Sequence, residues 1–190
     1  MSRWMLFVDG ENLTIRGQEI ARNRSSDYEL TQGDLYERDV FLWFARIPPT
    51  SSWVPGSWAI YQHKGIRAHY YTSVTGDDPK ILAVRESLRN IGFQPEVFKK
   101  DSQQVKAKGV DVALTKDMLS HAFLHNYDAA VLIAGDGDYV PLIREVQRLG
   151  KLVFVAFFLS NGMHRELRLA ADGIHDLMGI FEQSWRRSSR

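Results

Sequence analysis

Residues 129–158 read AAVLIAGDGDYVPLIREVQRLGKLVFVAFF, and this stretch decides the fold. The apolar run at 129–134 predicts a buried strand, and apolar residues at helical spacing over 139–149 predict a helix that Gly150 ends. A second apolar run, 152–158, predicts a second strand. A strand, a helix and another strand in this order form a right-handed crossover unit, so both strands should lie parallel in one sheet.

The same alternation of strands and helices continues on both sides of this stretch. Apolar patterns predict earlier strands at 4–8, 65–74 and 93–98, and helices at 13–22, 34–45, 79–91 and 109–124. Closing helical segments are expected at 165–171 and 174–181. The strands should therefore form a central, mostly parallel sheet with helices on both faces, which is an α/β fold of the three-layer α/β/α sandwich type.

The composition indicates an ordinary globular chain and excludes several kinds of site. With 190 residues, 44% of them hydrophobic, the chain can bury the core of one compact domain. The formal charge is only +1, so a nucleic-acid partner would have to be bound by local patches rather than by a general basic field. There is no cysteine, which excludes disulfides, thiolate metal ligands and a cysteine nucleophile.

The organisation predicted from the sequence is one domain over residues 1–183 with a short tail. Residues 184–190 are basic and are expected to form a flexible end. Residues 46–62 are rich in proline and aromatic side chains and are expected to form a loop, because proline interrupts regular structure. The first apolar run ends at Asp9 and is too short for a signal peptide or a membrane span, so we expect a cytoplasmic protein without a membrane segment.

Four aspartates are expected to meet at one edge of the predicted sheet. Asp9 ends the first strand, Asp111 opens the helix before the strand at 129–134, and Asp136 and Asp138 follow that strand. In an open parallel sheet, ligands bind outside the carboxyl ends of the strands, where neighbouring crossovers leave toward opposite faces. Clustered carboxylates repel one another unless a cation compensates them, and hard cations prefer carboxylate oxygens. We therefore expect a Mg²⁺ or Mn²⁺ site built from these four side chains.

Each residue near this edge also has an ordinary structural interpretation. Asp-Gly pairs are common in turns, and Asp111 could simply cap its helix. Asn12, one helical turn after Asp9, could cap the helix or orient a carboxylate or a metal-bound water. Asp117 lies six helical residues beyond Asp111 on the face expected to pack toward the sheet, so it should be substantially buried and have a supporting role. Lys108 could bind a substrate phosphate or be merely solvated.

Aromatic and basic side chains between the proline-rich loop and the second predicted strand are candidates for binding a nucleic acid. Trp53, Trp58 and Arg67 belong to this group, and proteins commonly bind single strands by stacking bases on aromatic rings. Aromatic residues of a long loop can equally fold back onto their own domain, as a lid or as part of the core. The six histidines are scattered and do not indicate a zinc site.

Three sequence blocks resemble one known family. They are FVDGEN at 7–12, KGVDVALTKDM at 108–118 and GDGDYVPL at 135–142. All three resemble, in order and with suitable spacing, the motifs of the NYN domains, a PIN-like nuclease group that includes the LabA-like proteins. The resemblance covers most of the chain.

The resemblance implies a metal-dependent ribonuclease with an α/β/α sandwich, acting on RNA. It assigns the acidic centre to Asp9, Asp111, Asp136 and Asp138, and Asn12 and Asp117 also match the motifs. An alternative from another class is a LabA-like regulator that binds RNA or protein without cleaving it, and a homo-oligomer is compatible with either. A phosphatase of the haloacid dehalogenase type is disfavoured, because Glu11 stands where that chemistry needs a second aspartate.

Overall fold

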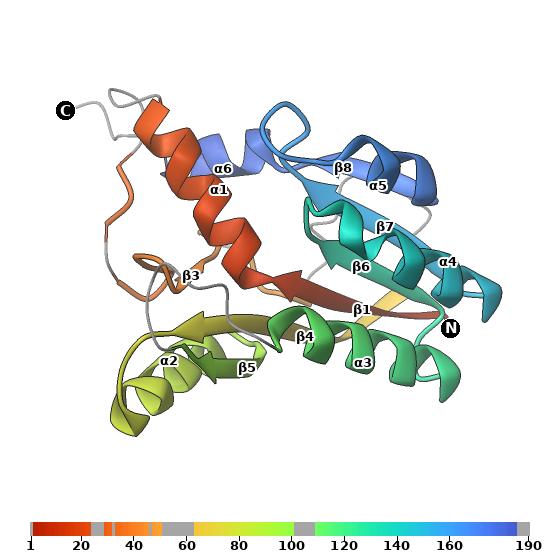
Figure 1. Cartoon of the computed structure of the whole chain (residues 1–190), viewed down its shortest axis with the longest axis horizontal. Coiled ribbons are helices and arrows are strands. Elements are labelled where there is room, and N and C mark those ends of the chain that lie inside the picture. The colour runs from red at the N-terminus through yellow and green to blue at the C-terminus, as the bar shows by residue number, and fades with distance from the viewer. Residues whose placement is uncertain are drawn as a thin grey trace.

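A six-stranded sheet forms the middle layer of the fold (Figure 1). The structure is a computed structural model and describes residues 2–23, 29–31, 33–45, 47–50, 63–100 and 109–185. The strands of the sheet are β1 (Ser2–Asp9), β4 (His63–Val74), β5 (Gln94–Lys99), β6 (Ala129–Ile133), β7 (Leu152–Phe157) and β8 (Gly173–Asp176). Their order is β5-β4-β1-β6-β7-β8, and each neighbouring pair is parallel.

Helices connect these strands and lie on both faces of the sheet (Figure 1). They are α1 (Gly10–Asn23), α2 (Asp78–Asn90), α3 (Val110–Phe123), the 3₁₀ turn η2 (Gly137–Tyr139), α4 (Val140–Arg148), α5 (Arg165–Ala170) and α6 (Met178–Trp185). A small antiparallel hairpin consists of β2 (Tyr36–Glu37) and β3 (Phe41–Leu42). The predicted α/β fold with a parallel central sheet is confirmed.

The crossovers run in two directions from the centre of the sheet. The chain moves from β1 to β4 and β5, then returns past β1 to β6, β7 and β8. Because such crossovers are right-handed, α1 and α2 cover one face, and α3, α4 and α5 cover the other. The direction reverses between β1 and β6, which are paired from Trp4 with Ala129 to Val8 with Ile133. The carboxyl ends of these two strands are therefore the place where an open parallel sheet binds ligands.

Two elements differ from the sequence prediction. Residues 34–45, expected to be helical, instead form turns and the β2–β3 hairpin. The apolar residues there are consecutive and all of residues 40–44 are buried, whereas a surface helix buries only one stripe. The helical prediction for residues 174–181 is wrong in its first half, where β8 adds a sixth strand before α6 begins. This strand is too short for an alternating pattern to stand out.

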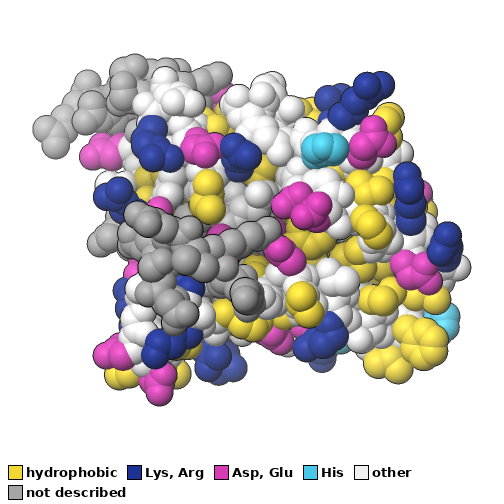
Figure 2. All heavy atoms as spheres, viewed as in Figure 1, with side chains coloured by type: hydrophobic (Ala, Val, Ile, Leu, Met, Phe, Trp, Pro, Cys, Tyr) yellow, Lys and Arg dark blue, Asp and Glu magenta, His cyan; other side chains and the backbone are white. Residues whose placement is uncertain are grey.

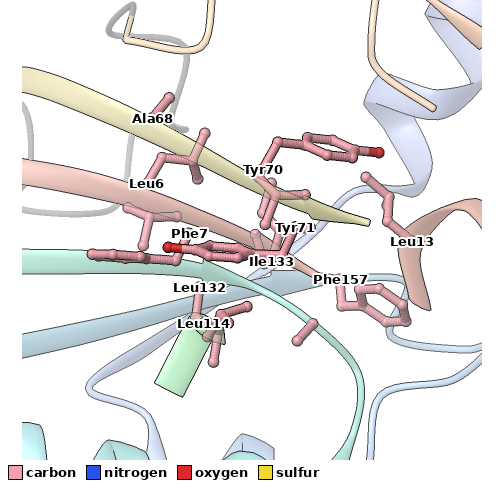
Figure 3. Close-up of a cluster of buried hydrophobic side chains, with 14 of the residues drawn as sticks. Leu6, Phe7, Leu13, Ala68, Tyr70, Tyr71, Leu114, Leu132, Ile133 and Phe157 are labelled. Atoms are coloured by element: carbon pink, nitrogen blue, oxygen red, sulfur yellow. The ribbon is translucent and has the colours of Figure 1, made fainter. Parts of the chain in front are cut away.

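The core lies on both faces of the central strands. β6 is wholly buried and β1 and β7 nearly so, which is why they read as continuous apolar runs. Successive side chains of β4 point to opposite faces of the sheet. Figure 3 shows Tyr70 of β4 on the same face as Leu13 of α1, and Leu114 of α3 on the opposite face. The Tyr70 hydroxyl donates to the carbonyl oxygen of Leu42 at 3.0 Å and so ties the hairpin to the sheet. No described helix is long and apolar enough to cross a membrane.

His69 is a buried base in the middle of β4. Its ring stacks on Phe7, with a distance of 5.4 Å between ring centroids, and also contacts Tyr71 and His121. Burial, followed by the charge of His121, lowers the pKa of His69 from 6.5 to about 4, although Asp117 acts in the opposite direction. At neutral pH the folded chain therefore holds this imidazole in its neutral form.

The folded chain should lose stability as the pH falls from about 6.5 to about 4. In this range the unfolded chain binds a proton at residue 69 that the folded chain excludes, so the free energy of unfolding decreases with falling pH. Urea unfolding at about pH 7 and about pH 5 measures the loss. A His69→Phe variant keeps a ring in the stack and should lose less stability. Equal losses in the two proteins would contradict this origin of the pH dependence.

Candidate functional site

Asp9 is the last residue of β1 and the residue that caps α1. One of its carboxylate oxygens, Oδ1, accepts a hydrogen bond from the backbone amide of Asn12 at 3.0 Å, which is an N-cap interaction. The other oxygen, Oδ2, accepts from the hydroxyl of Tyr139 at 2.9 Å. Asp9 is only 4% exposed, so its carboxylate lies beneath the surface at the junction of β1 and β6. The cap of α1 is therefore Asp9, and the capping alternative for Asn12 is wrong.

Asp111 lies in the first turn of α3, where Gly109 occupies the capping position. Gly109 has a φ of 118°, a left-handed conformation that favours glycine, and it leaves Asp111 one residue inside the helix. The capping alternative for Asp111 is therefore wrong. Instead, Oδ1 of Asp111 accepts a hydrogen bond from the Tyr139 hydroxyl at 3.1 Å. Asp9 and Asp111, from two distant segments, thus meet at one phenolic oxygen.

Tyr139 joins the candidate site, although the sequence alone did not indicate it. It is 3% exposed and its hydroxyl is the group that both carboxylates share. Burial and the two aspartates, Asp9 and Asp111, strongly raise the pKa of Tyr139, so the hydroxyl keeps its proton. The one available signal was its position directly after the Gly-Asp-Gly-Asp segment, which delivers the ring to the same edge of the sheet.

Asp136 and Asp138 lie in the turn that follows β6, here called the acidic turn (residues 135–139). Oδ1 of Asp136 accepts from the backbone amide of Asp138 at 3.1 Å and thereby caps η2. Asp136 is half-buried and Asp138 is exposed. Gly135, the first residue of the turn, is buried, and a Cβ there would lie 2.5 Å from the carbonyl oxygen of Gly162 and would also overlap the ring of Phe157. The glycine therefore lets the turn pack closely on the end of β7.

Two polar side chains near these acids have contacts that the sequence could not specify. Oδ1 of Asn12 accepts from the backbone amide of Gly135 at 2.9 Å, which ties the first turn of α1 to the acidic turn. Asp117 accepts from the Tyr71 hydroxyl at 3.0 Å and pairs with Lys116 at 3.2 Å. The side chain of Asp117 is 17% exposed, as its position on α3 predicted, and its partners are a hydroxyl and an ammonium group.

A buried ion pair lies on the other side of Asp9, at the carboxyl ends of β4 and β5. Oε1 of Glu11 accepts from the ammonium of Lys100 at 3.2 Å and from the hydroxyl of Ser73 at 3.1 Å. Both charged side chains are more than nine-tenths buried, and Oε2 of Glu11 has no hydrogen-bond partner among the residues that the structure describes. The first turn of α1 is therefore attached on one side to β4 and the end of β5, and on the other side to the acidic turn.

The remaining candidate residues lie elsewhere or outside the described residues. Arg67 is exposed on β4 and is paired with Met5, whereas the carboxyl end of β1 is paired with Tyr71. Four residues of strand separate Arg67 from that edge, which is roughly 13 Å. Lys108, Trp53 and Trp58 lie outside the described residues, as does most of the predicted loop at 46–62.

The acidic edge has the right donor chemistry for a divalent cation. Figure 2 shows one face of the molecule, with acidic side chains near its middle beside hydrophobic side chains. Lys and Arg side chains lie mainly around the margin of that face. The structure joins Asp9 to Asp111 through Tyr139 and holds Asp136 and Asp138 in the neighbouring acidic turn. Within the part of the chain that the structure describes, no three His, Cys, Asp or Glu side chains are grouped closely enough to hold a metal ion.

Comparison with known proteins assigns the chain to a family. The sequence pattern of the NYN domain, a domain of the PIN-like nuclease kind, matches residues 3–178. A crystal structure of a protein of unknown function from Vibrio parahaemolyticus is similar, with a TM-score of 0.60 and 22% identity over 98% of this chain and 96% of that chain. At this identity the likeness shows the fold alone. No curated protein matches. Because the NYN pattern spans nearly all of its length, the chain belongs to the NYN domain family.

Proposed function

We propose that this chain is a metal-dependent ribonuclease that hydrolyses phosphodiester bonds of RNA. The observation that carries the proposal is the meeting of Asp9 and Asp111 at the Tyr139 hydroxyl, at the carboxyl edge of the sheet in a chain of the NYN family. Stability alone does not call for this arrangement, because two carboxylates held close together, one buried and one half-buried, repel each other. A site that binds a cation accounts for it.

The ligands proposed for Mg²⁺ or Mn²⁺ are the carboxylates of Asp9, Asp111, Asp136 and Asp138. Because no three of them are grouped closely enough in the described structure to share one ion, the proposal requires these side chains to draw together when a cation binds. All are hard oxygen donors, which is the ligand type that these cations prefer. A bound cation of this kind activates water and offsets negative charge on the phosphate.

The side chains around the acids hold them in place. The bond from Gly135 to Asn12 keeps the acidic turn against α1, and the bond from Asn12 to Asp9 keeps that carboxylate at the helix start. Burial increases from the exposed Asp138 through the half-buried Asp136 to the buried Asp9. An RNA backbone would therefore approach from the side of the acidic turn, with Asp9 beneath it.

The decisive experiment is an RNA cleavage assay with controlled metal content. The purified chain is incubated with a single-stranded and a structured RNA in the presence of Mg²⁺, Mn²⁺ or EDTA, beside DNA of the same sequence. We expect cleavage with either cation, loss of cleavage in EDTA, and recovery when the cation is added in excess. Cleavage that continues in EDTA would contradict the metal dependence. RNA or protein binding without cleavage would favour the LabA-like regulator instead.

A further inference from the structure

The Tyr139 hydroxyl lies where three separate segments of the acidic edge meet. It comes from the acidic turn, and its two partners come from the end of β1 and the start of α3. We infer that Tyr139 is a positioning residue, whose hydroxyl sets the separation of the Asp9 and Asp111 carboxylates and so prepares them to bind a divalent cation. This inference rests on the proposed function, since it concerns the same carboxylates.

The position of the Tyr139 hydroxyl is fixed by its surroundings. The residue ends η2, where its backbone amide donates to the carbonyl oxygen of Asp136 at 3.4 Å, and α4 begins immediately after it. The side chain is buried, so the ring has little freedom to rotate away from the two acids. Asp136 caps η2 and Tyr139 ends it. The same short turn therefore fixes the position of Asp136 and of the Tyr139 hydroxyl, which donates to Asp9.

A tyrosine hydroxyl can link two carboxylates without cancelling their charge. Its single proton is donated to Asp9 or to Asp111, at 2.9 and 3.1 Å respectively, so the two acids share one donor. A lysine or arginine at residue 139 would add a positive charge and compete with a cation, whereas a phenylalanine would leave the carboxylates without this link. The phenol therefore restrains the spacing of the acids while their negative charge remains available.

The inference predicts a specific defect in a Tyr139→Phe variant. This change keeps the ring and removes only the shared hydrogen bonds. We expect the dissociation constant for Mn²⁺, measured by calorimetry or electron paramagnetic resonance on metal-free protein, to rise about tenfold, which corresponds to about 1.4 kcal/mol. For RNA cleavage at a fixed subsaturating Mn²⁺ concentration, kcat should fall while KM for RNA changes little, because the substrate does not contact a hydroxyl buried beneath the acids.

The chain offers a matched control in Tyr127. This tyrosine is equally buried, and its hydroxyl donates to the carbonyl oxygen of Met118 at 2.8 Å, with no bond to an acid of the site. Tyr127→Phe therefore removes a buried tyrosine hydrogen bond of ordinary structural kind. We expect it to lower the midpoint of thermal unfolding to a similar degree as Tyr139→Phe does, and to leave the Mn²⁺ dissociation constant unchanged.

The outcomes separate this inference from the proposed function. If the unaltered chain binds no Mn²⁺, the proposed function fails and the inference fails with it. If the unaltered chain binds Mn²⁺ and cleaves RNA, but Tyr139→Phe binds Mn²⁺ equally well, only the positioning role is overturned. Equal weakening in both variants would also overturn it, since that result indicates a general loss of stability. Circular dichroism checks folding, and unfolding of Tyr139→Phe alone would show a structural requirement in place of a positioning role.

Discussion

Replacing Asp9 by asparagine is expected to lower kcat for metal-dependent RNA cleavage by about 10²- to 10³-fold, because the amide removes one negative charge from the proposed cation site. The fold should survive the change. Asparagine is as good an N-cap as aspartate, so the amide oxygen can still accept from the backbone of Asn12 and hold the start of α1. Initial rates in Mn²⁺, together with thermal unfolding of the same samples, measure both effects.

The control for this change is an aspartate at the opposite edge of the sheet. Asp128 precedes β6, and its carboxylate accepts from the backbone amide of Arg3 at 2.8 Å. Asp128→Asn removes the same charge far from the acidic edge and should leave the cleavage rate unchanged. The companion variant Asp136→Asn is expected to reduce the rate as well. Metal-dependent cleavage that survives in both Asp9→Asn and Asp136→Asn would rule out the proposed site.

Replacing Lys100 by methionine is expected to destabilise the fold by about 3–5 kcal/mol, because it leaves the carboxylate of Glu11 buried without its counter-charge. Methionine keeps the unbranched stem of the lysine, so loss of packing contributes little. The free energy of unfolding in urea measures the effect. A double variant with Glu11→Leu and Lys100→Met removes both charges and should recover most of the lost stability.

An exposed ion pair provides the reference for the Lys100 result. Arg148 and Glu145 lie on α4 with a distance of 2.9 Å between their charged groups, and their side chains are 76% and 47% exposed. Arg148→Met should change the free energy of unfolding by less than about 1 kcal/mol, since solvent screens such pairs. If Lys100→Met has an equally small effect, or if the double variant is no more stable than Lys100→Met, burial of the unpaired charge is not the cause.

The central sheet was predictable because its strands are buried on both faces. Runs such as residues 129–134 are apolar throughout, and a crossover between two of them has one common handedness, so pattern and chirality together specify a parallel sheet. The β2–β3 hairpin and β8 were not predictable in the same way. The hairpin places a consecutive apolar run under α1, and β8 takes its strand conformation from pairing with β7 rather than from its own sequence.

The candidate site was predictable as a location but not as a set of contacts. Asp9 ends one strand, and Asp136 and Asp138 follow another whose carboxyl end shares the same edge, so their region could be stated in advance. The meeting of Asp9 and Asp111 depends on the phenol of Tyr139, and no sequence spacing indicates where that hydroxyl points. The burial of Glu11 beside Lys100 likewise follows from the packing of α1 against β4 and the residue that follows β5, which periodicity does not determine.

The hydrogen bond between Asp9 and Tyr139 joins residues 130 positions apart in the chain. A contact of such long range forms only after β1 and β6 have paired at the centre of the sheet, since the entropy of closing so large a loop must be overcome first. A chain emerging from the ribosome therefore carries Asp9 and Asp111 for some time before their carboxylates can meet at the Tyr139 hydroxyl. The two carboxylates can thus be joined through Tyr139 only once synthesis has passed residue 139 and both halves of the sheet are present.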